Sequence, residues 1–147
     1  MDFFEIYPTI HNMEKEKSLF EQYHDSIGKQ IKVDDFNMKE VQMALPTNRH
    51  YWVGRLMFHK FELQRLKKMR KQASLKIIEK IKEESPVSLT GRAMDDMINH
   101  HEAIRKIDDM YTENELLIEY LSKIENNFRD LGFAIKNMIE IVRMETT

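Results

Sequence analysis

Apolar residues recur along most of the chain at the three- and four-residue spacing of an amphipathic helix. The clearest stretch covers residues 49–84, which contain no proline and a single glycine, Gly54. Its apolar positions share one arc of about 100° on a helical projection. These positions are Trp52, Leu56, His59, Leu63, Leu66, Ala73, Ile77 and Ile81. Because they step by four and three residues, they predict a long helix with a coiled-coil-like seam, into which Arg70 intrudes.

The residues before this helix carry weaker patterns. Residues 12–30 have helical spacing, and Gly28 is placed to end that segment. The next stretch, 30–36, alternates apolar and polar residues and predicts a short extended element. Residues 38–45 predict two turns of helix that stop before Pro46, because the residue preceding a proline is pushed out of the helical region.

After a short linker, the C-terminal part predicts several further helices. The first covers residues 92–110. Thr112 and Glu115 then form the capping box T-x-x-E, which indicates a new helix start. Gly132 predicts a helix end or a kink, and a last amphipathic helix follows at 133–144.

These elements predict an all-α protein that forms one helical domain over residues 1–147. A short helical and extended segment (1–48) precedes a long helix (49–84), which packs with an antiparallel helical hairpin in the region 92–147. Four glycines and three prolines in 147 residues favour long helices with few turns. With 41% hydrophobic and 33% charged residues the core is thin, which predicts oligomerisation. The predicted core or subunit-interface residues are Leu117, Leu121, Ile124, Phe128, Ile135, Ile139 and Val142.

The formal net charge of −2 hides a strong segregation of charge along the chain. Residues 1–48 carry 5 basic and 9 acidic side chains, whereas residues 49–82 carry 11 basic and only 2 acidic ones. Residues 83–147 carry 7 basic and 14 acidic side chains. The long helix is therefore basic wherever it is not buried, which indicates a polyanionic partner or an acidic protein surface.

The basic helix provides the candidate contacts to a nucleic acid. Cations that follow a phosphate backbone, with aromatic rings beside them, are typical of proteins that bind single strands without sequence preference. The candidate phosphate contacts are Lys60, Arg65, Lys67, Lys68, Arg70, Lys71, Lys76 and Lys80. Phe58 and Phe61 are candidates for base stacking, with packing on another helix or subunit as the alternative. A solvated basic face is the plain alternative for the cations.

Several other classes of function are not supported. The chain has no cysteine, no glycine-rich phosphate loop and none of the common hydrolase or zinc motifs, so we expect no enzyme, metal site or cofactor. The adjacent His100 and His101 point about 100° apart on a helix and cannot chelate one ion together. No run approaches the roughly 18 apolar residues of a membrane span, and the N-terminus lacks signal-peptide character. We therefore expect a cytoplasmic protein without membrane contact.

The C-terminal stretch LGFAIKNMIEIVRMET (131–146) resembles the end of the phage UvsY-type recombination mediators, which close with a Gly or Trp, an aromatic or apolar residue and an I-K-N/H-x-I-type motif. Upstream, Tyr51-Trp52 followed by the basic run RLKKMRK (65–71) is similar to the Trp-led basic helix of that family. The likeness covers about residues 50–145. The family's DNA-contact motif resembles L-K-x-R. In this chain Leu75-Lys76 is followed by Ile77-Ile78, so the second cation of that motif is absent. We therefore place the DNA contacts in the denser basic run from Arg65 to Lys76.

The resemblance implies a small helical protein that assembles into a ring-like homo-oligomer through its C-terminal part. It further implies binding to single-stranded DNA and help in loading a RecA-like recombinase onto strands covered by single-strand-binding protein, in the host cytoplasm if the chain is phage-encoded. The alternative is a non-enzymatic helical adaptor or assembly protein whose basic helix docks on an acidic protein partner.

Overall fold

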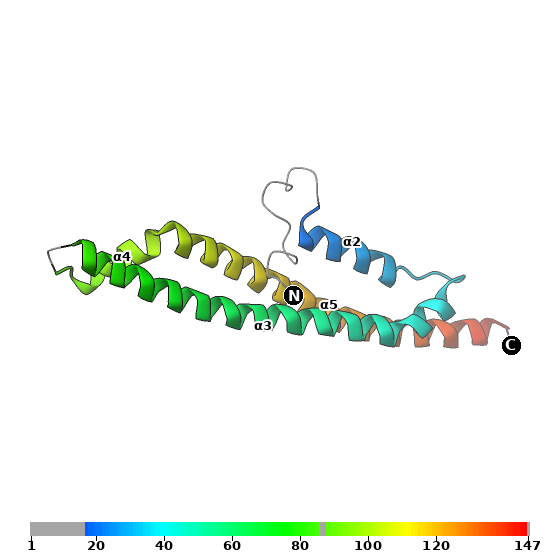
Figure 1. Cartoon of the computed structure of the whole chain (residues 1–147). Helices are drawn as coiled ribbons and strands as arrows, with labels where there is room; N and C mark the ends of the chain where they lie inside the picture. The colour runs from blue at the N-terminus through cyan, green and yellow to red at the C-terminus, as the bar shows by residue number, and fades with distance from the viewer. Residues whose placement is uncertain (1–16, 86–87, 147) are drawn as a thin grey trace. The chain divides into compact units, whose positions relative to one another are not determined.

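The computed structural model describes residues 17–85 and 88–146, and the described residues are almost entirely helical (Figure 1). The helices are α2 (Leu19–Ile31), α3 (Met38–Glu84), α4 (Gly91–His100) and α5 (Glu102–Thr146). The predicted all-α class is thus confirmed. Residues 12–16 of the first predicted helix and residue 87 of the predicted linker lie outside the described residues.

The chain forms two compact units, and α3 and α5 each contribute to both. The described part of the first unit contains α2, the first twelve residues of α3 (38–49) and residues 127–146 of α5. The second unit, residues 50–126, contains the rest of α3, all of α4 and the first part of α5.

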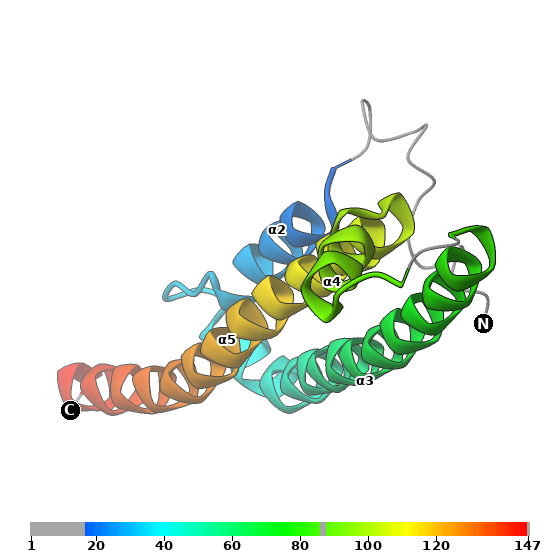
Figure 2. The same ribbon diagram turned by 90° about the vertical axis from the view of Figure 1, so that its left-hand side faces the viewer.

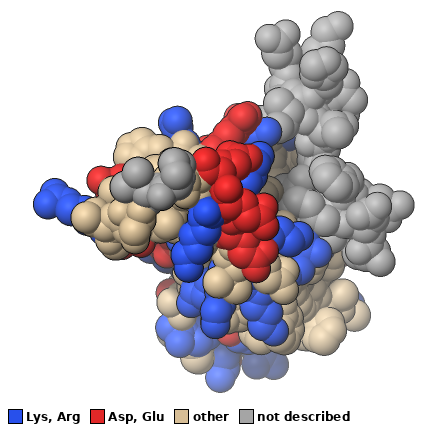
Figure 3. Space-filling model, turned by 60° about the vertical axis from the view of Figure 1, so that its left-hand side comes forward, with Lys and Arg blue, Asp and Glu red and all other residues tan. Residues whose placement is uncertain are grey.

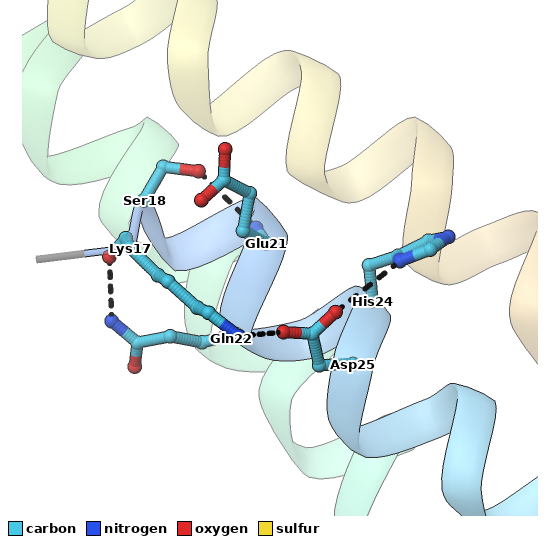
Figure 4. Close-up of polar contacts among 6 residues, drawn as sticks. All are labelled: Lys17, Ser18, Glu21, Gln22, His24 and Asp25. Atoms are coloured by element: carbon cyan, nitrogen blue, oxygen red, sulfur yellow. Dashed lines mark hydrogen bonds and ion pairs between the residues drawn. The ribbon is translucent and has the colours of Figure 1, made fainter.

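The helix α2 begins at a side-chain cap. The Ser18 hydroxyl accepts a hydrogen bond from the Glu21 backbone N–H at 3.2 Å, which satisfies one of the free donors of the first turn (Figure 4). Lys17 forms an ion pair with Asp25 along the same surface. The helix continues past Gly28 to Ile31, so the predicted end at Gly28 is wrong.

The predicted extended element at 30–36 is also wrong. Gln30 and Ile31 belong to α2, and the residues that follow form a turn rather than a strand. Asp34 Oδ1 accepts hydrogen bonds from the backbone N–H groups of Phe36 and Asn37 at 2.8 and 3.0 Å. The Asn37 side chain accepts in turn from the Asp34 N–H at 2.7 Å. These local bonds satisfy backbone groups that a strand would need a neighbour to satisfy.

The helix α3 continues through Pro46 for 47 residues, whereas the sequence predicted a stop before this proline. Proline removes one hydrogen bond from a helix, because it has no N–H to donate to the carbonyl of Gln42. Both Pro46 and Gln42 are exposed, so water can satisfy that carbonyl. The apolar packing on either side therefore outweighs the local penalty.

The C-terminal half also has different boundaries from those predicted. The predicted helix at 92–110 is interrupted at His101, whose ring Nδ1 accepts from the Ala103 N–H at 3.2 Å and caps the start of α5. Thr112 lies inside α5 and donates its hydroxyl proton to the Asp108 carbonyl at 3.1 Å, so it is not the predicted cap. Gly132 lies inside α5, so it does not end one helix and begin another as predicted. A Cβ placed on it would lie 3.1 Å from Leu45 Cδ2, so its missing side chain lets α3 and α5 approach.

The second unit is an antiparallel pairing of α3 and α5, closed by α4. His59 contacts Asn114, and Arg70, further along α3, contacts Asp108, which is earlier in α5, so the two helices run in opposite directions (Figure 2). Buried side chains of both helices repeat at intervals of seven residues, as in a coiled coil. On α3 these are Trp52, His59 and Leu66, and on α5 they are Ile107, Asn114 and Leu121.

Candidate nucleic-acid interface

The basic segment of α3, residues 60–80, presents the candidate lysines to solvent. The exposed members of the set are Lys60, Lys67, Lys68, Lys71, Lys76 and Lys80. Figure 3 shows Lys and Arg side chains below and on both sides of a central band of Asp and Glu side chains. The six lysines are held on one continuous helix, which fixes their spacing along its axis.

Acidic residues hardly interrupt this surface. Between residues 50 and 78, all of which the structure describes, Glu62 is the one acidic residue. Glu62 is buried, with 8% of its surface exposed, and its carboxylate lies 3.3 Å from Arg65 Nη2. The half-buried Arg65 therefore neutralises Glu62 within α3, and the solvent-facing charge of this stretch is positive throughout.

Arg70 has a different environment from the lysines. It lies in the seam of α3, where Nε and Nη2 donate to the Asp108 carboxylate at 2.8 and 3.4 Å. Nη2 also donates to Asn99 Oδ1 at 3.0 Å. The hydrogen bond to Asp108 raises the pKa of Arg70, against a smaller opposing effect of burial. Arg70 thus links α3 to both α4 and α5, which explains why a charged residue falls within the apolar arc.

The two candidate aromatic rings also differ. Phe58 is half-buried: the Arg55 guanidinium lies 4.9 Å from its ring centre, and the His59 ring packs edge-on at 5.2 Å. Phe61 has 68% of its surface exposed. Phe61 therefore presents its ring to solvent, whereas protein groups already cover part of Phe58.

A buried polar pair between α3 and α5 was not predicted from the sequence. His59 and Asn114 are both fully buried, and His59 Nδ1 lies 2.8 Å from Asn114 Oδ1. Since an amide oxygen only accepts, Nδ1 carries the proton and donates. Asn114 Nδ2 donates to the Met110 carbonyl at 2.9 Å. Burial lowers the pKa of His59, the Asn114 bond opposes this effect, and the charge of Arg55 lowers the pKa further. The seven-residue spacing from Ile107 to Asn114 to Leu121 is the signal that could have revealed this pair.

The predicted core or interface residues of α5 fall into two groups. Five are buried within the chain itself: Leu117, Leu121, Ile124, Phe128 and Ile135. Ile139 is half-buried, and Val142 is 40% exposed. Beside Val142, the large apolar residues Phe133, Ile141 and Met144 are exposed as well. The end of α5 therefore has exposed apolar side chains that none of the described residues covers.

The described residues contain no group of three or more His, Asp or Glu side chains that could hold a metal ion. His100 and His101 act separately: His100 Nδ1 lies 2.7 Å from the Asp96 carbonyl oxygen, while His101 caps α5. No helix in the described part of the chain combines the length and the apolar character needed to cross a membrane.

The fold is similar to that of the bacteriophage T4 recombination mediator protein UvsY in two crystal structures. With one of them, lattice type IV, the TM-score is 0.75 at 16% sequence identity, over 87% of this chain and 99% of that chain. With the other, lattice type II, the TM-score is 0.73 at 17% identity, over 90% of this chain and all of that chain. No protein-family model and no curated protein matches the sequence. The comparisons therefore establish a UvsY-like fold for this chain, as the sequence resemblance implied.

Proposed function

We propose that this chain is a single-stranded DNA-binding recombination mediator. It helps to load a RecA-like recombinase onto single-stranded DNA that single-strand-binding protein covers. The observation that carries this proposal is the set of six exposed lysines spread around the solvent-facing sides of α3, on a stretch whose one acidic residue between 50 and 78 is buried against Arg65. The likeness in fold to a phage recombination mediator supports the same reading.

The proposed mechanism involves binding and no bond chemistry. Lys60, Lys67, Lys68, Lys71, Lys76 and Lys80 contact phosphates, and the exposed ring of Phe61 stacks on a base. Arg65 and Arg70 support the segment from within, because each already has a carboxylate partner in the chain. Their side chains remain about two-fifths exposed, so a phosphate close to either one still experiences its charge.

Assembly of several copies increases the overall affinity for a DNA strand above the modest affinity of one copy. We propose that the exposed apolar residues Phe133, Ile141 and Met144, which share one side of the end of α5, join copies into a ring-like homo-oligomer, with Val142 exposed on the opposite side. Each copy then presents its own basic segment, and a strand held by one copy meets the next at a high effective concentration. The bound strand is thereby held in a shape that favours recombinase nucleation over single-strand-binding protein.

Charge reversal in the basic segment tests the DNA-binding role. The variant Lys67→Glu, Lys68→Glu, Lys71→Glu is measured by fluorescence anisotropy with a labelled oligo-dT. The matched control is Lys29→Glu, Lys32→Glu, Lys136→Glu, which changes the net charge equally at exposed positions outside the segment. We expect the first variant to lose DNA binding while its oligomer mass is retained, and the control to bind like the wild type. Equal losses in both variants would show that only net charge matters.

The loading step needs its own measurement. Single-stranded DNA is first covered with single-strand-binding protein, and ATP hydrolysis by the RecA-like recombinase is then followed. Addition of the wild-type chain should restore hydrolysis, and addition of the triple-reversal variant should not. DNA binding without any restoration would contradict the mediator role and leave a plain DNA-binding protein.

One observation favours a second function, a helical adaptor for an acidic protein partner. Val53, Met57 and Phe61 follow one another at four-residue intervals on α3, and all three are exposed. An apolar row beside lysines suits an acidic amphipathic segment as well as a DNA strand. This function would replace the first if oligo-dT failed to bind even at low salt.

A further inference from the structure

The exposed lysines of the basic segment form two groups on opposite flanks of α3. Each residue of an α-helix is turned by about 100° from the one before it. On this projection three lysines fall within about 40° of one another and define the first flank: Lys60, Lys67 and Lys71. Two more fall within about 40° of each other, about 180° away, and define the second flank: Lys76 and Lys80. One straight line along α3 therefore does not join both groups.

The buried seam of α3 separates the two flanks on the side of α5. Trp52, His59 and Leu66 lie roughly 90° from either flank and are buried, so no strand can pass there. The opposite, outer side of α3 is open to solvent. It carries the exposed Lys68, about 160° from Leu66, and the exposed Gln72. A strand that contacts both flanks must therefore cross this outer side.

The order of the lysines along the chain fits such a crossing. All lysines of the first flank precede those of the second, and Lys68 lies between the flanks on the outer side. The step from Lys71 on one flank to Lys76 on the other is short, a rise of about 7.5 Å along the axis. No residue between Glu62 and Glu79 is acidic. A strand that advances along α3 can thus pass from flank to flank without meeting a carboxylate of this helix.

We propose that a bound single strand crosses the outer side of α3 from the first flank to the second, and that Lys76 and Lys80 distinguish it from a duplex. The inference rests on the proposed DNA-binding function and assigns the path of the strand and the residues that select it. A single strand is flexible enough to bend around a helix about 10–12 Å across. A duplex has a persistence length of about 150 bp, so it stays straight over this distance. It therefore contacts one flank, and the first flank offers it more lysines.

The number of phosphate contacts favours the crossing path over a path along one flank. A strand on the first flank alone meets three lysines and a strand on the second meets two, whereas the crossing strand meets both groups and Lys68. Each phosphate contact releases a counterion from the strand and strengthens binding at low salt. Since the outer side between the flanks is exposed and carries its own cation, the crossing path has the most favourable electrostatics that α3 offers.

The test compares oligo-dT with a dT·dA duplex of the same length, by fluorescence anisotropy of the full-length protein at several salt concentrations. The variant Lys76→Glu, Lys80→Glu should flatten the single-strand slope of log K against log [salt] by at least about 1.4, from roughly 0.7 per lost contact, and leave the duplex slope unchanged. The matched variant Lys60→Glu, Lys67→Glu reverses the same number of charges and should flatten both slopes. If a reversal lowers the helix content, the corresponding Lys→Gln variants repeat the comparison. An unchanged single-strand slope in the Lys76, Lys80 variant, or an equal loss on the duplex, would overturn the proposal.

A crosslink at the crossing point separates this inference from the proposed function. Gln72 is exposed on the outer side, about 40° from both Lys68 and Lys76. The chain has no cysteine, so a benzophenone attached to the variant Gln72→Cys labels this position alone. Oligo-dT should crosslink there and the duplex should not, and neither should crosslink to the control Glu119→Cys, at an exposed position of α5. Binding of oligo-dT without a crosslink at Gln72 would overturn the crossing path and leave the proposed function standing. Failure of the wild type to bind oligo-dT would overturn both.

Discussion

The buried pair of His59 and Asn114 makes a quantitative prediction about stability. The variant Asn114→Leu keeps the number and branching of the side-chain heavy atoms but removes the amide oxygen that accepts from His59 Nδ1 at 2.8 Å. It also removes the bond from Asn114 to the Met110 carbonyl. Because both side chains are fully buried, water cannot replace the lost acceptor. A buried donor that loses its partner costs about 1–3 kcal/mol, which lowers Tm by about 3–10 °C in a chain of this size.

The same pair predicts a dependence of stability on pH. Burial lowers the pKa of His59 in the folded state below its unfolded value of 6.5. As the pH falls, the unfolded state therefore binds the proton before the folded state does. The contribution of His59 to the free energy of unfolding is thus complete above pH 6.5. It is lost as the pH falls from 6.5 toward the folded pKa, by at most about 1.4 kcal/mol per pH unit for one proton. The variant His59→Leu should not show this loss of stability below pH 6.5.

The assay is urea unfolding followed by helical circular dichroism at pH 7.5 and 5.5. Asn126→Leu, at an exposed position of α5, is the matched control and should unfold like the wild type. The double variant His59→Leu, Asn114→Leu should recover most of the stability that Asn114→Leu alone loses, because no buried donor is then left without its acceptor. The reasoning is refuted if Asn114→Leu is as stable as the wild type, or if His59→Leu retains the full pH dependence.

Three further predictions concern single positions. Gly54→Ala should raise the free energy of unfolding by about 1 kcal/mol, because the site is helical and nothing lies within 4 Å of the added Cβ. Gly132→Ala should gain less, because its added Cβ lies 3.1 Å from Leu45 Cδ2. Thermal unfolding of both variants measures the difference. Arg70→Leu should lower Tm by a few degrees, because it removes the bonds that join α3 to α4 and α5, and an unchanged Tm would contradict that bracing role. Ile141→Asp should yield smaller species in light scattering without loss of helix content, and an unchanged mass would remove the end of α5 from the proposed interface.

The sequence predicted the helical class and the seam of α3 well, because apolar residues at four- and three-residue steps leave few alternatives to a paired helix. Trp52, Leu56 and Leu66 are buried as that spacing requires. The intrusion of Arg70 was visible too. Its partners Asp108 and Asn99 were not, because they lie 38 and 29 residues further along the chain and no local pattern joins them.

Helix boundaries were predicted less well, because local signals were outweighed by packing over a long helix. Pro46 and the Thr112 capping box both predicted breaks, yet α3 and α5 continue through them. A helix of more than forty residues that packs along its length gains more from continuity than one proline or one cap can offset. At 30–36 the opposite happened, since hydrogen bonds from Asp34 and Asn37 produced a turn where alternation suggested a strand.

The candidate site could be predicted in part. The basic character of residues 49–82 followed from counting charges, and the exposure of Lys67, Lys68 and Lys71 agrees with their positions away from the seam. The pairing of Glu62 with Arg65, and the cover that Arg55 gives Phe58, depend on side-chain geometry within α3.

The affinity for oligo-dT as a function of salt concentration tests the central claim most directly. If the six exposed lysines of the basic segment, residues 60–80, contact phosphates, log K should fall linearly with log [salt] with a slope of up to about −4, from roughly 0.7 per contact on a single strand. The Lys67, Lys68, Lys71 reversal should flatten the slope by at least about 2, or abolish binding altogether. Binding that is insensitive to salt, or no binding at low salt, would contradict the account.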